Sequence, residues 1–400
     1  MDSTSPTRRR LIATTASALV AARFPAPALA QDATPSPAGG GDGSPPSMLE
    51  LAYDPILDGG TGPSTLFTYA NIARQLEVRG LRSLDAAMAD EDRCSEWADG
   101  VDGLYLQDVL LTYPRTEELW QTLGFGPADV TQTLVLGDPP QTTRIYRGRF
   151  DGDRILSSLA DWGYERVETK RGTVVTIGRD GEIDMRGAIV SFVLNTYNNI
   201  AVVDDADVVA CPYLADLETA LADFAGNGAS LANYRAVDTL LTAVGEELVS
   251  ATIVDGGGLS TANMPGLGML GASTPEPATI ARAAYALFGI TPGSMPSRYT
   301  DEDDQLQGAN DAAAPRSALV VALHLGSVAE AEATVPVIEG RLAEGVSLLN
   351  GQAYADLLGP ATVEGVAGTP VVKVRLTGDR VGRFWLRALF GRDLAFVYTE

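Results

Sequence analysis

The chain contains 400 residues, with 52 acidic and 29 basic side chains, so its formal net charge is −23. A field of this sign repels phosphate groups, which argues against nucleic acid and anionic membranes as partners. One histidine and two cysteines leave no conventional zinc site. A chain of this length usually needs more than one core, so two domains are expected.

Residues 1–30 have the features of an export signal. Three arginines at 8–10 precede a short apolar run, and Ala-Leu-Ala at 28–30 matches a signal-peptidase site. The stretch TRRRLI resembles the twin-arginine export signal, and an ordinary secretory signal is the alternative. We expect cleavage before Gln31, with retention of the apolar run as an anchor left open. Residues 31–46, rich in Pro, Gly and Ser, then form a flexible tether.

The region after the signal carries no further membrane signature. No cysteine lies close to the cleavage point, so the lipid anchor of bacterial lipoproteins is not expected. No later stretch of about 18 residues is continuously apolar, so no transmembrane span is expected after cleavage. Residues 1–30 hold four arginines and one aspartate, so their removal changes the net charge from −23 to −26. We expect an exported protein, either secreted or associated with the cell envelope.

The two cysteines, Cys94 and Cys211, are far apart in the sequence. Outside the cytoplasm a disulfide can persist, and one that closes so long a loop would stabilise the fold by about 4 to 5 kcal/mol in the chain-entropy model. We therefore predict a bridge between them. The alternative is two free thiols, with Cys211 packed at the end of a strand.

Alternating and helical patterns of apolar residues predict the elements after the tether. The first region suggests a strand at 65–71, a helix at 72–80 and helical pieces around Trp97 and Trp120. The predicted elements that follow are strands at 142–150, 164–169 and 173–178, a helix at 151–162, a hairpin at 200–211, and a helix from 214. A strand at 250–254 and a helix at 278–288 come next. The last region predicts strands at 318–326, 361–368, 370–376 and 394–398, with helices at 327–343 and from 379.

These elements place the chain in the α+β class. We expect two lobes, 47–235 and 236–400, each with an antiparallel sheet that has helices on one face, and a flexible segment at 255–315. The order of elements after residue 317 is βαββαβ, which resembles the ferredoxin-like arrangement. That fold supports many unrelated activities, so it carries no function with it.

Few residues suggest a particular chemistry. His324 shares a strand face with Val320 and Ala322, which is typical of a half-buried structural histidine rather than a catalytic base. The tryptophans Trp162 and Trp385 fall on apolar helix faces, where core packing is expected. A weak alternative is a calcium site at Asp301, Asp303 and Asp304, although the surrounding residues fail the helix-loop-helix calcium pattern and favour a solvated acidic loop.

The stretch GLGMLG at 266–271 matches the glycine pattern of dinucleotide-binding loops. It has no strand directly before it, two prolines where the helix should be, and no acidic residue about 20 positions later. We therefore expect no nucleotide cofactor. The loop instead offers four apolar side chains as a contact surface for a partner: Met264, Leu267, Met269 and Leu270.

The sequence alone does not define a biochemical activity. A clear export signal without a catalytic signature favours a non-enzymatic protein that binds a protein or small ligand at the cell surface. The alternative is an exported hydrolase that depends on carboxylates, since acid pairs leave no short motif.

Overall fold

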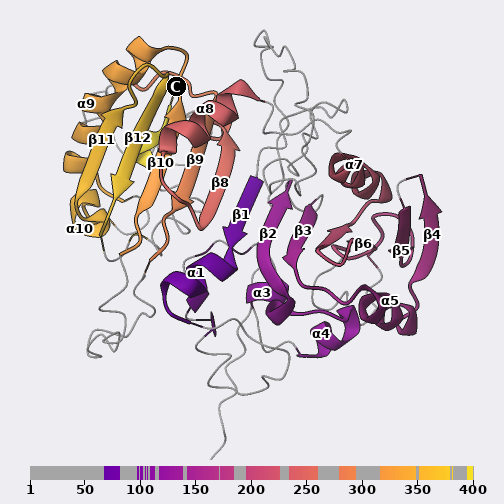
Figure 1. Cartoon of the computed structure of the whole chain (residues 1–400). Coiled ribbons are helices and arrows are strands. Elements are labelled where there is room, and N and C mark those ends of the chain that lie inside the picture. The colour runs from indigo at the N-terminus through magenta and orange to yellow at the C-terminus, as the bar shows by residue number, and fades with distance from the viewer. Residues whose placement is uncertain are drawn as a thin grey trace, which may run out of the picture. The chain divides into compact units, whose positions relative to one another are not determined.

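The computed structural model describes residues 67–81, 97–98, 100–101, 104, 106, 109–112, 117–137, 142–170, 172–183, 195–225, 234–259, 279–293, 316–347, 351–378, 381 and 394–399. The described strands form one twelve-stranded sheet in the order β11-β12-β10-β9-β8-β1-β2-β3-β7-β6-β5-β4 (Figure 1). All neighbouring strands are antiparallel. This confirms the predicted mixture of helices and antiparallel sheet.

Most strands lie within one or two residues of their predicted positions. The strands are β1 (Phe67–Asn71), β2 (Val130–Leu136), β3 (Thr143–Gly148), β4 (Glu165–Thr169), β5 (Gly172–Thr176), β6 (Asn199–Val203), β7 (Asp207–Cys211), β8 (Ser250–Asp255), β9 (Tyr285–Ile290), β10 (Leu319–His324), β11 (Ala361–Gly365) and β12 (Val371–Leu376). The helices are α1 (Ile72–Val78), α3 (Val109–Thr112), α4 (Glu117–Leu123), α5 (Gly152–Asp161), α7 (Leu214–Phe224), α8 (Arg235–Val244), α9 (Val328–Glu344) and α10 (Tyr354–Leu358). Short 3-10 turns are η1 (Pro127–Asp129), η3 (Gly256–Leu259) and η7 (Ala395–Val397).

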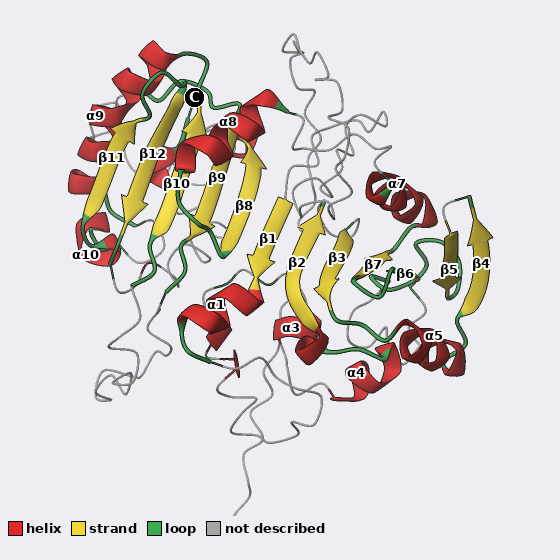
Figure 2. Cartoon of the chain, in the orientation of Figure 1, coloured by secondary structure: helices red, strands yellow, loops and turns green. Residues whose placement is uncertain are grey.

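Helices cover both faces of the sheet, which corrects the prediction that helices lie on one face (Figure 2). Along β10, Leu319, Val321 and Leu323 join an apolar cluster that also contains residues of α1, α3, α4, α5, α9 and α10. The alternating residues Val320 and Ala322 join a second cluster with residues of α7 and α8. Because successive side chains of a strand point to opposite faces, the two clusters are the two sides of the sheet.

The two halves of the sheet have related strand orders and meet at the antiparallel pair β1 and β8. The first half runs β1, α1, α3, α4, β2, β3, α5, β4, β5 along the chain, and the second runs β8, β9, β10, α9, α10, β11, β12, so the halves share the order of their strands but not of all their helices. The hairpin of β6 and β7 separates β3 from β5 in the first half, whereas β12 lies directly beside β10 in the second. The halves therefore form one continuous sheet.

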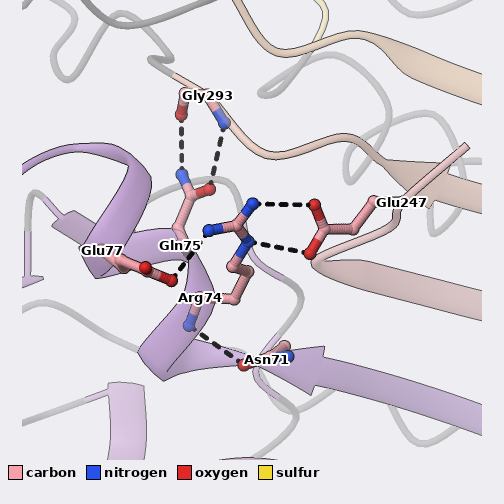
Figure 3. Close-up of polar contacts among 6 residues, drawn as sticks. All are labelled: Asn71, Arg74, Gln75, Glu77, Glu247 and Gly293. Atoms are coloured by element: carbon pink, nitrogen blue, oxygen red, sulfur yellow. Dashed lines mark hydrogen bonds and ion pairs between the residues drawn. The ribbon is translucent and has the colours of Figure 1, made fainter.

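A buried glutamine in α1 connects the first half to the second (Figure 3). Gln75 has no exposed surface. Its amide Nε2 donates to the carbonyl oxygen of Gly293 at 2.9 Å, and the Gly293 backbone N–H donates back to its Oε1 at 3.3 Å. On the exposed side of α1, the Arg74 guanidinium contacts both carboxylate oxygens of Glu247 at 2.8 and 3.1 Å. The loops before β8 and after β9 are thus held to α1.

The predicted helix at 278–288 is wrong, because Tyr285–Ile290 forms the strand β9. Alanine favours a helix there, but β9 pairs along its whole length with β8 on one side and β10 on the other. Both pairings bury the strand's apolar residues, and this burial outweighs the weak helical preference. The segment 255–315, predicted to be flexible, therefore includes one of the inner strands of the sheet.

The predicted closing strand at 394–398 is also wrong, since Ala395–Val397 forms the 3-10 turn η7. The Arg341 guanidinium of α9 donates to the carbonyl oxygens of Ala395 and Tyr398 at 3.3 and 2.8 Å. In addition, β10 already has β9 and β12 as neighbours, so it offers no free edge. The β10-α9-β11-β12 portion of the predicted βαββαβ unit is present, and most of the predicted helix from 379 lies outside the described residues.

Candidate functional site: an open sheet edge

Among the described strands, β4 forms one end of the sheet and pairs with β5 alone. Figure 1 shows β4 as the outermost labelled strand on that side. Its residues Glu165, Arg166 and Glu168 are exposed, while Val167 and Thr169 are half-buried. An open edge presents unpaired backbone groups that can pair with a further strand.

The hairpin geometry decides which backbone groups of β4 face outward. Thr169 and Gly172 face each other across the hairpin, and only positions 170 and 171 lie between them in the sequence. A two-residue hairpin closes at a hydrogen-bonded pair, and hydrogen-bonded and non-hydrogen-bonded pairs alternate along the strands. Residues 165, 167 and 169 therefore direct their backbone groups to β5. The N–H and C=O groups of Arg166 and Glu168 are directed to the free edge.

An exposed tryptophan lies shortly before the start of β4 in the sequence. Trp162 caps the C-terminal end of α5 and is 45% exposed, so the prediction that it packs in the core is wrong. The apolar face of α5 is filled by Ile155 and Leu159, which are fully buried. The helix ends at Asp161, and Gly163 has a left-handed φ of 88°, so Trp162 lies outside the helical turns that carry Ile155 and Leu159. The other tryptophan assigned to the core, Trp385, lies outside the described residues.

Buried tyrosines hold the start of β4 in place. The Tyr164 hydroxyl donates to the backbone carbonyl oxygen of Tyr197 at 2.8 Å, and its backbone N–H donates to the carbonyl of Leu159. The hydroxyls of Tyr146 and Tyr197 are 2.6 Å apart, and their rings are stacked with centroids 6.4 Å apart. Burial raises the pKa of Tyr164 well above its ordinary value, so it stays a neutral donor. The edge strand therefore begins at a rigid point.

A second feature is a pair of carboxylates at the N-terminus of α7. Asp180 Oδ1 accepts the backbone N–H of Leu214 at 2.6 Å and the Asn199 side-chain amide at 3.2 Å. The carboxyl group of Asp216 is partly buried, and this burial, followed by the charge of Asp180, raises its pKa. A carboxyl with a raised pKa beside a second carboxylate is an arrangement that acid-base catalysis uses.

Cys211 lies close to this pair and is a free, fully buried thiol. Its Sγ lies 3.2 Å from the Thr143 hydroxyl, and burial raises its pKa well above the ordinary value. The predicted bridge to Cys94 is therefore not formed in the structure, where the Cys211 thiol packs in the apolar cluster that contains residues of α7 and α8. Cys94 itself lies outside the described residues.

His324 ends β10 on the α8 side of the sheet, in register with Tyr285 of β9 and Val371 of β12. It is half-buried, and burial, with a smaller effect of the Arg235 charge, lowers its pKa. Its Nδ1 atom is buried and has no hydrogen-bond partner among the residues that the structure describes.

The remaining predicted site residues lie outside the described residues. These are the apolar loop residues Met264, Leu267, Met269 and Leu270 and the weak calcium candidates Asp301, Asp303 and Asp304. Within the described part of the chain, no three metal-ligating His, Cys, Asp or Glu side chains come together. Among the same residues, no helix is both long enough and apolar enough to cross a membrane.

Sequence reasoning placed β4 correctly but did not mark it as a site. The alternation of charges in Glu165-Arg166-Val167-Glu168 was visible, yet any solvated strand can show it. That β4 lies at an end of the sheet follows only from the order of all twelve strands.

The comparisons with known proteins leave the function open. No protein-family model matches the chain, and no curated protein matches it. One solved structure, crystal form IV of TP0453, is similar with a TM-score of 0.35 and 9% sequence identity. The match covers 84% of this chain and 98% of that one. A similarity of this strength carries no argument about function.

Proposed function

We propose that the chain is exported and acts as a non-enzymatic binding protein, with the outer edge of β4 as its binding surface. The observation that carries this proposal is the exposed strand itself, with the backbone groups of Arg166 and Glu168 directed outward. Such an edge binds an extended segment through main-chain hydrogen bonds, and neighbouring side chains add specificity. Trp162, which precedes β4 in the sequence, exposes a large apolar side chain that could add to such binding.

A peptide selection tests this binding surface. The mature chain from Gln31 is used to select extended peptides from a display library, and the selected peptides are then measured against two variants. Arg166→Pro removes the outward N–H, and an edge strand tolerates proline where that N–H faces solvent. Arg166→Ala is the matched control, because it keeps the N–H and removes the same side chain. We expect binding to be lost in Arg166→Pro and kept in Arg166→Ala, with both variants folded by circular dichroism.

Two results would contradict this role. The selection would yield no peptide above background, or the selected peptides would bind both variants equally. The second result would show that the peptides use another surface.

The export proposal rests on residues 1–30, which lie outside the described residues. Full-length chain expressed in a bacterium with a twin-arginine pathway should appear outside the cytoplasm with Gln31 as its first residue. Replacing Arg8 and Arg9 together by lysine should block export, because the twin-arginine receptor reads the pair. Undiminished export of this variant would favour the ordinary secretory signal, and cytoplasmic retention of the wild type would contradict export.

The carboxylate pair favours one alternative function, an exported carboxylate-dependent hydrolase. Asp216 would act as the acid and Asp180 as the second carboxylate. The mature chain is assayed against chromogenic glycosides and esters, together with Asp216→Asn. Turnover that this variant abolishes would replace the binding role, whereas turnover that persists in the variant would exclude this pair.

We also infer that the two halves of the sheet correspond to the two predicted lobes, 47–235 and 236–400. This inference is supported by the order that the two halves share along the chain, in which three strands are followed by a helical connection and then by a two-stranded hairpin. The halves are co-expressed as two separate fragments, 47–235 and 236–400. These fragments should reassemble through the pairing of β1 with β8. Fragments that stay unfolded in each other's presence would contradict two lobes.

A further inference from the structure

We propose that the partner of the β4 edge is a second copy of this chain, paired antiparallel about a two-fold axis at Val167. This inference rests on the proposed binding edge and names its occupant. The two copies would join their sheets edge to edge, with β4 beside β4 of the second copy.

The outward backbone groups limit the registers that are possible. A second antiparallel strand must place its own outward-directed residues opposite Arg166 and Glu168 of the first copy. With Val167 on the axis, Arg166 of each copy faces Glu168 of the other. Each such pair exchanges two backbone hydrogen bonds, so the seam contains four. Tyr164 adds none through its N–H, because this group already donates to Leu159.

The side chains favour this register over its neighbours. Cross-strand partners share a face, so each Arg166 guanidinium meets a Glu168 carboxylate, and the seam contains two opposite-charge pairs. Sliding the strands by one step in one direction places Arg166 opposite Arg166. The same step in the other direction places Glu168 opposite Glu168 and Arg166 opposite Lys170. Both neighbouring registers therefore bring like charges together.

The described surroundings leave the two side chains available. Glu168 accepts a hydrogen bond from the Thr173 hydroxyl at 3.0 Å, which positions its carboxylate on the face that Arg166 shares. The strand at the opposite end of the sheet, β11, does not offer the same pattern. Its charged side chain, Glu364, is already paired with Lys373 at 2.9 Å. Charge complementarity thus selects β4 rather than β11 for pairing with a second copy.

Charge exchange is the first test. Sedimentation velocity of the mature chain over a wide concentration range, at physiological ionic strength, should show a monomer-dimer equilibrium that stops at the dimer. Arg166→Glu should raise the dissociation constant about tenfold or more, because it turns two attractive pairs into two repulsive ones. The double variant R166E/E168R restores opposite charges in the same register, so its dissociation constant should return close to the wild-type value.

A matched control separates pairing from net charge. Glu165→Arg and Glu168→Arg change the net charge by the same amount, but Glu165 faces the uncharged Thr169 in this register. We expect Glu168→Arg to weaken the dimer strongly and Glu165→Arg to leave it unchanged or tighten it slightly. Circular dichroism and thermal unfolding confirm that each variant is folded, which is expected because these side chains are exposed.

A cysteine at the axis tests the register directly. Val167 would face its own copy in a non-hydrogen-bonded pair, where the Cα atoms are about 4.5 Å apart, within reach of a disulfide. Mild oxidation of Val167→Cys should therefore yield a covalent dimer, while Thr169→Cys and the wild type, with their native thiols, should not.

The possible results distinguish a failure of the second copy as partner from a failure of β4 as the binding surface. A wild type that stays monomeric at all concentrations, forms oligomers beyond the dimer, or dimerises with no response to charge reversal would overturn the second copy as partner. If peptides still bind β4 in the selection above, the proposed function survives that failure. If neither peptides nor a second copy bind, both proposals fail.

Discussion

Replacing Gln75 by methionine should destabilise the fold strongly, because it removes two buried hydrogen bonds to Gly293. Gln75 is fully buried, and Gly293 is buried as well. Methionine has nearly the volume of glutamine, so little cavity is created, and the main loss is that both Gly293 backbone groups lose their partner. Each buried group left without a partner costs about 1 to 3 kcal/mol, so the loss of both partners should lower the free energy of unfolding by about 2 to 6 kcal/mol.

The assay is urea unfolding followed by circular dichroism, with the slope of the transition compared between variants. Arg74→Met is the matched control one residue earlier in α1, and it removes the exposed ion pair with Glu247. We expect this control to change the unfolding midpoint only slightly, because exposed ion pairs are screened by water. A loss below about 1 kcal/mol for Gln75→Met, or a larger loss for the control, would refute the reasoning.

Three further predictions follow from burial. The pKa of His324 is lowered, so between this pKa and the ordinary value of about 6.5 the unfolded chain binds more protons, and stability should fall as pH drops through this window. An NMR titration of the single imidazole checks the direction, and a pKa at or above 6.5 would contradict it. Trp162→Ala should change stability by no more than about 0.5 kcal/mol, whereas Leu159→Ala should cost about 2 to 5 kcal/mol in the same denaturation assay; equal losses would contradict the exposure of Trp162. Cys211 should resist thiol reagents until the protein unfolds, and rapid labelling of Cys211 in the native protein, located by peptide mass spectrometry, would show that it is accessible.

The elements that could be predicted are those whose pattern is local. In α5, the Asp151 carboxylate accepts the Arg154 backbone N–H and caps the helix that was predicted at 151–162. In α9, the Ser327 hydroxyl oxygen accepts the Glu330 backbone N–H and caps that helix. The hairpin of β6 and β7 turns at Asp204 and Asp205, both with positive φ angles of 51° and 55°. Each of these depends on residues a few positions apart, which a reader of the sequence can see together.

The errors arose where distant residues decide the structure. A helix was predicted for an alanine-rich segment that instead supplies β9, because two flanking strands bury it. The segment at 394–398 looked like a strand, but its carbonyl oxygens are bound by Arg341, more than fifty residues earlier. Trp162 fell on an apolar stripe, yet the helix ended just before it. Local preferences of a few tenths of a kcal/mol give way to burial of this kind.

The sequence by itself determined the α+β class, most strand and helix positions, the acidic charge and the expectation of export. It also placed alternating charges on β4, because a strand's side-chain period depends only on its own residues. The tertiary structure alone decided that all twelve strands join one sheet, that helices cover both of its faces, and that β4 ends it. These features depend on pairings between residues far apart in the chain, such as β1 with β8 or Gln75 with Gly293. Their free energy comes from burial and hydrogen bonds that exist only once both partners are in place.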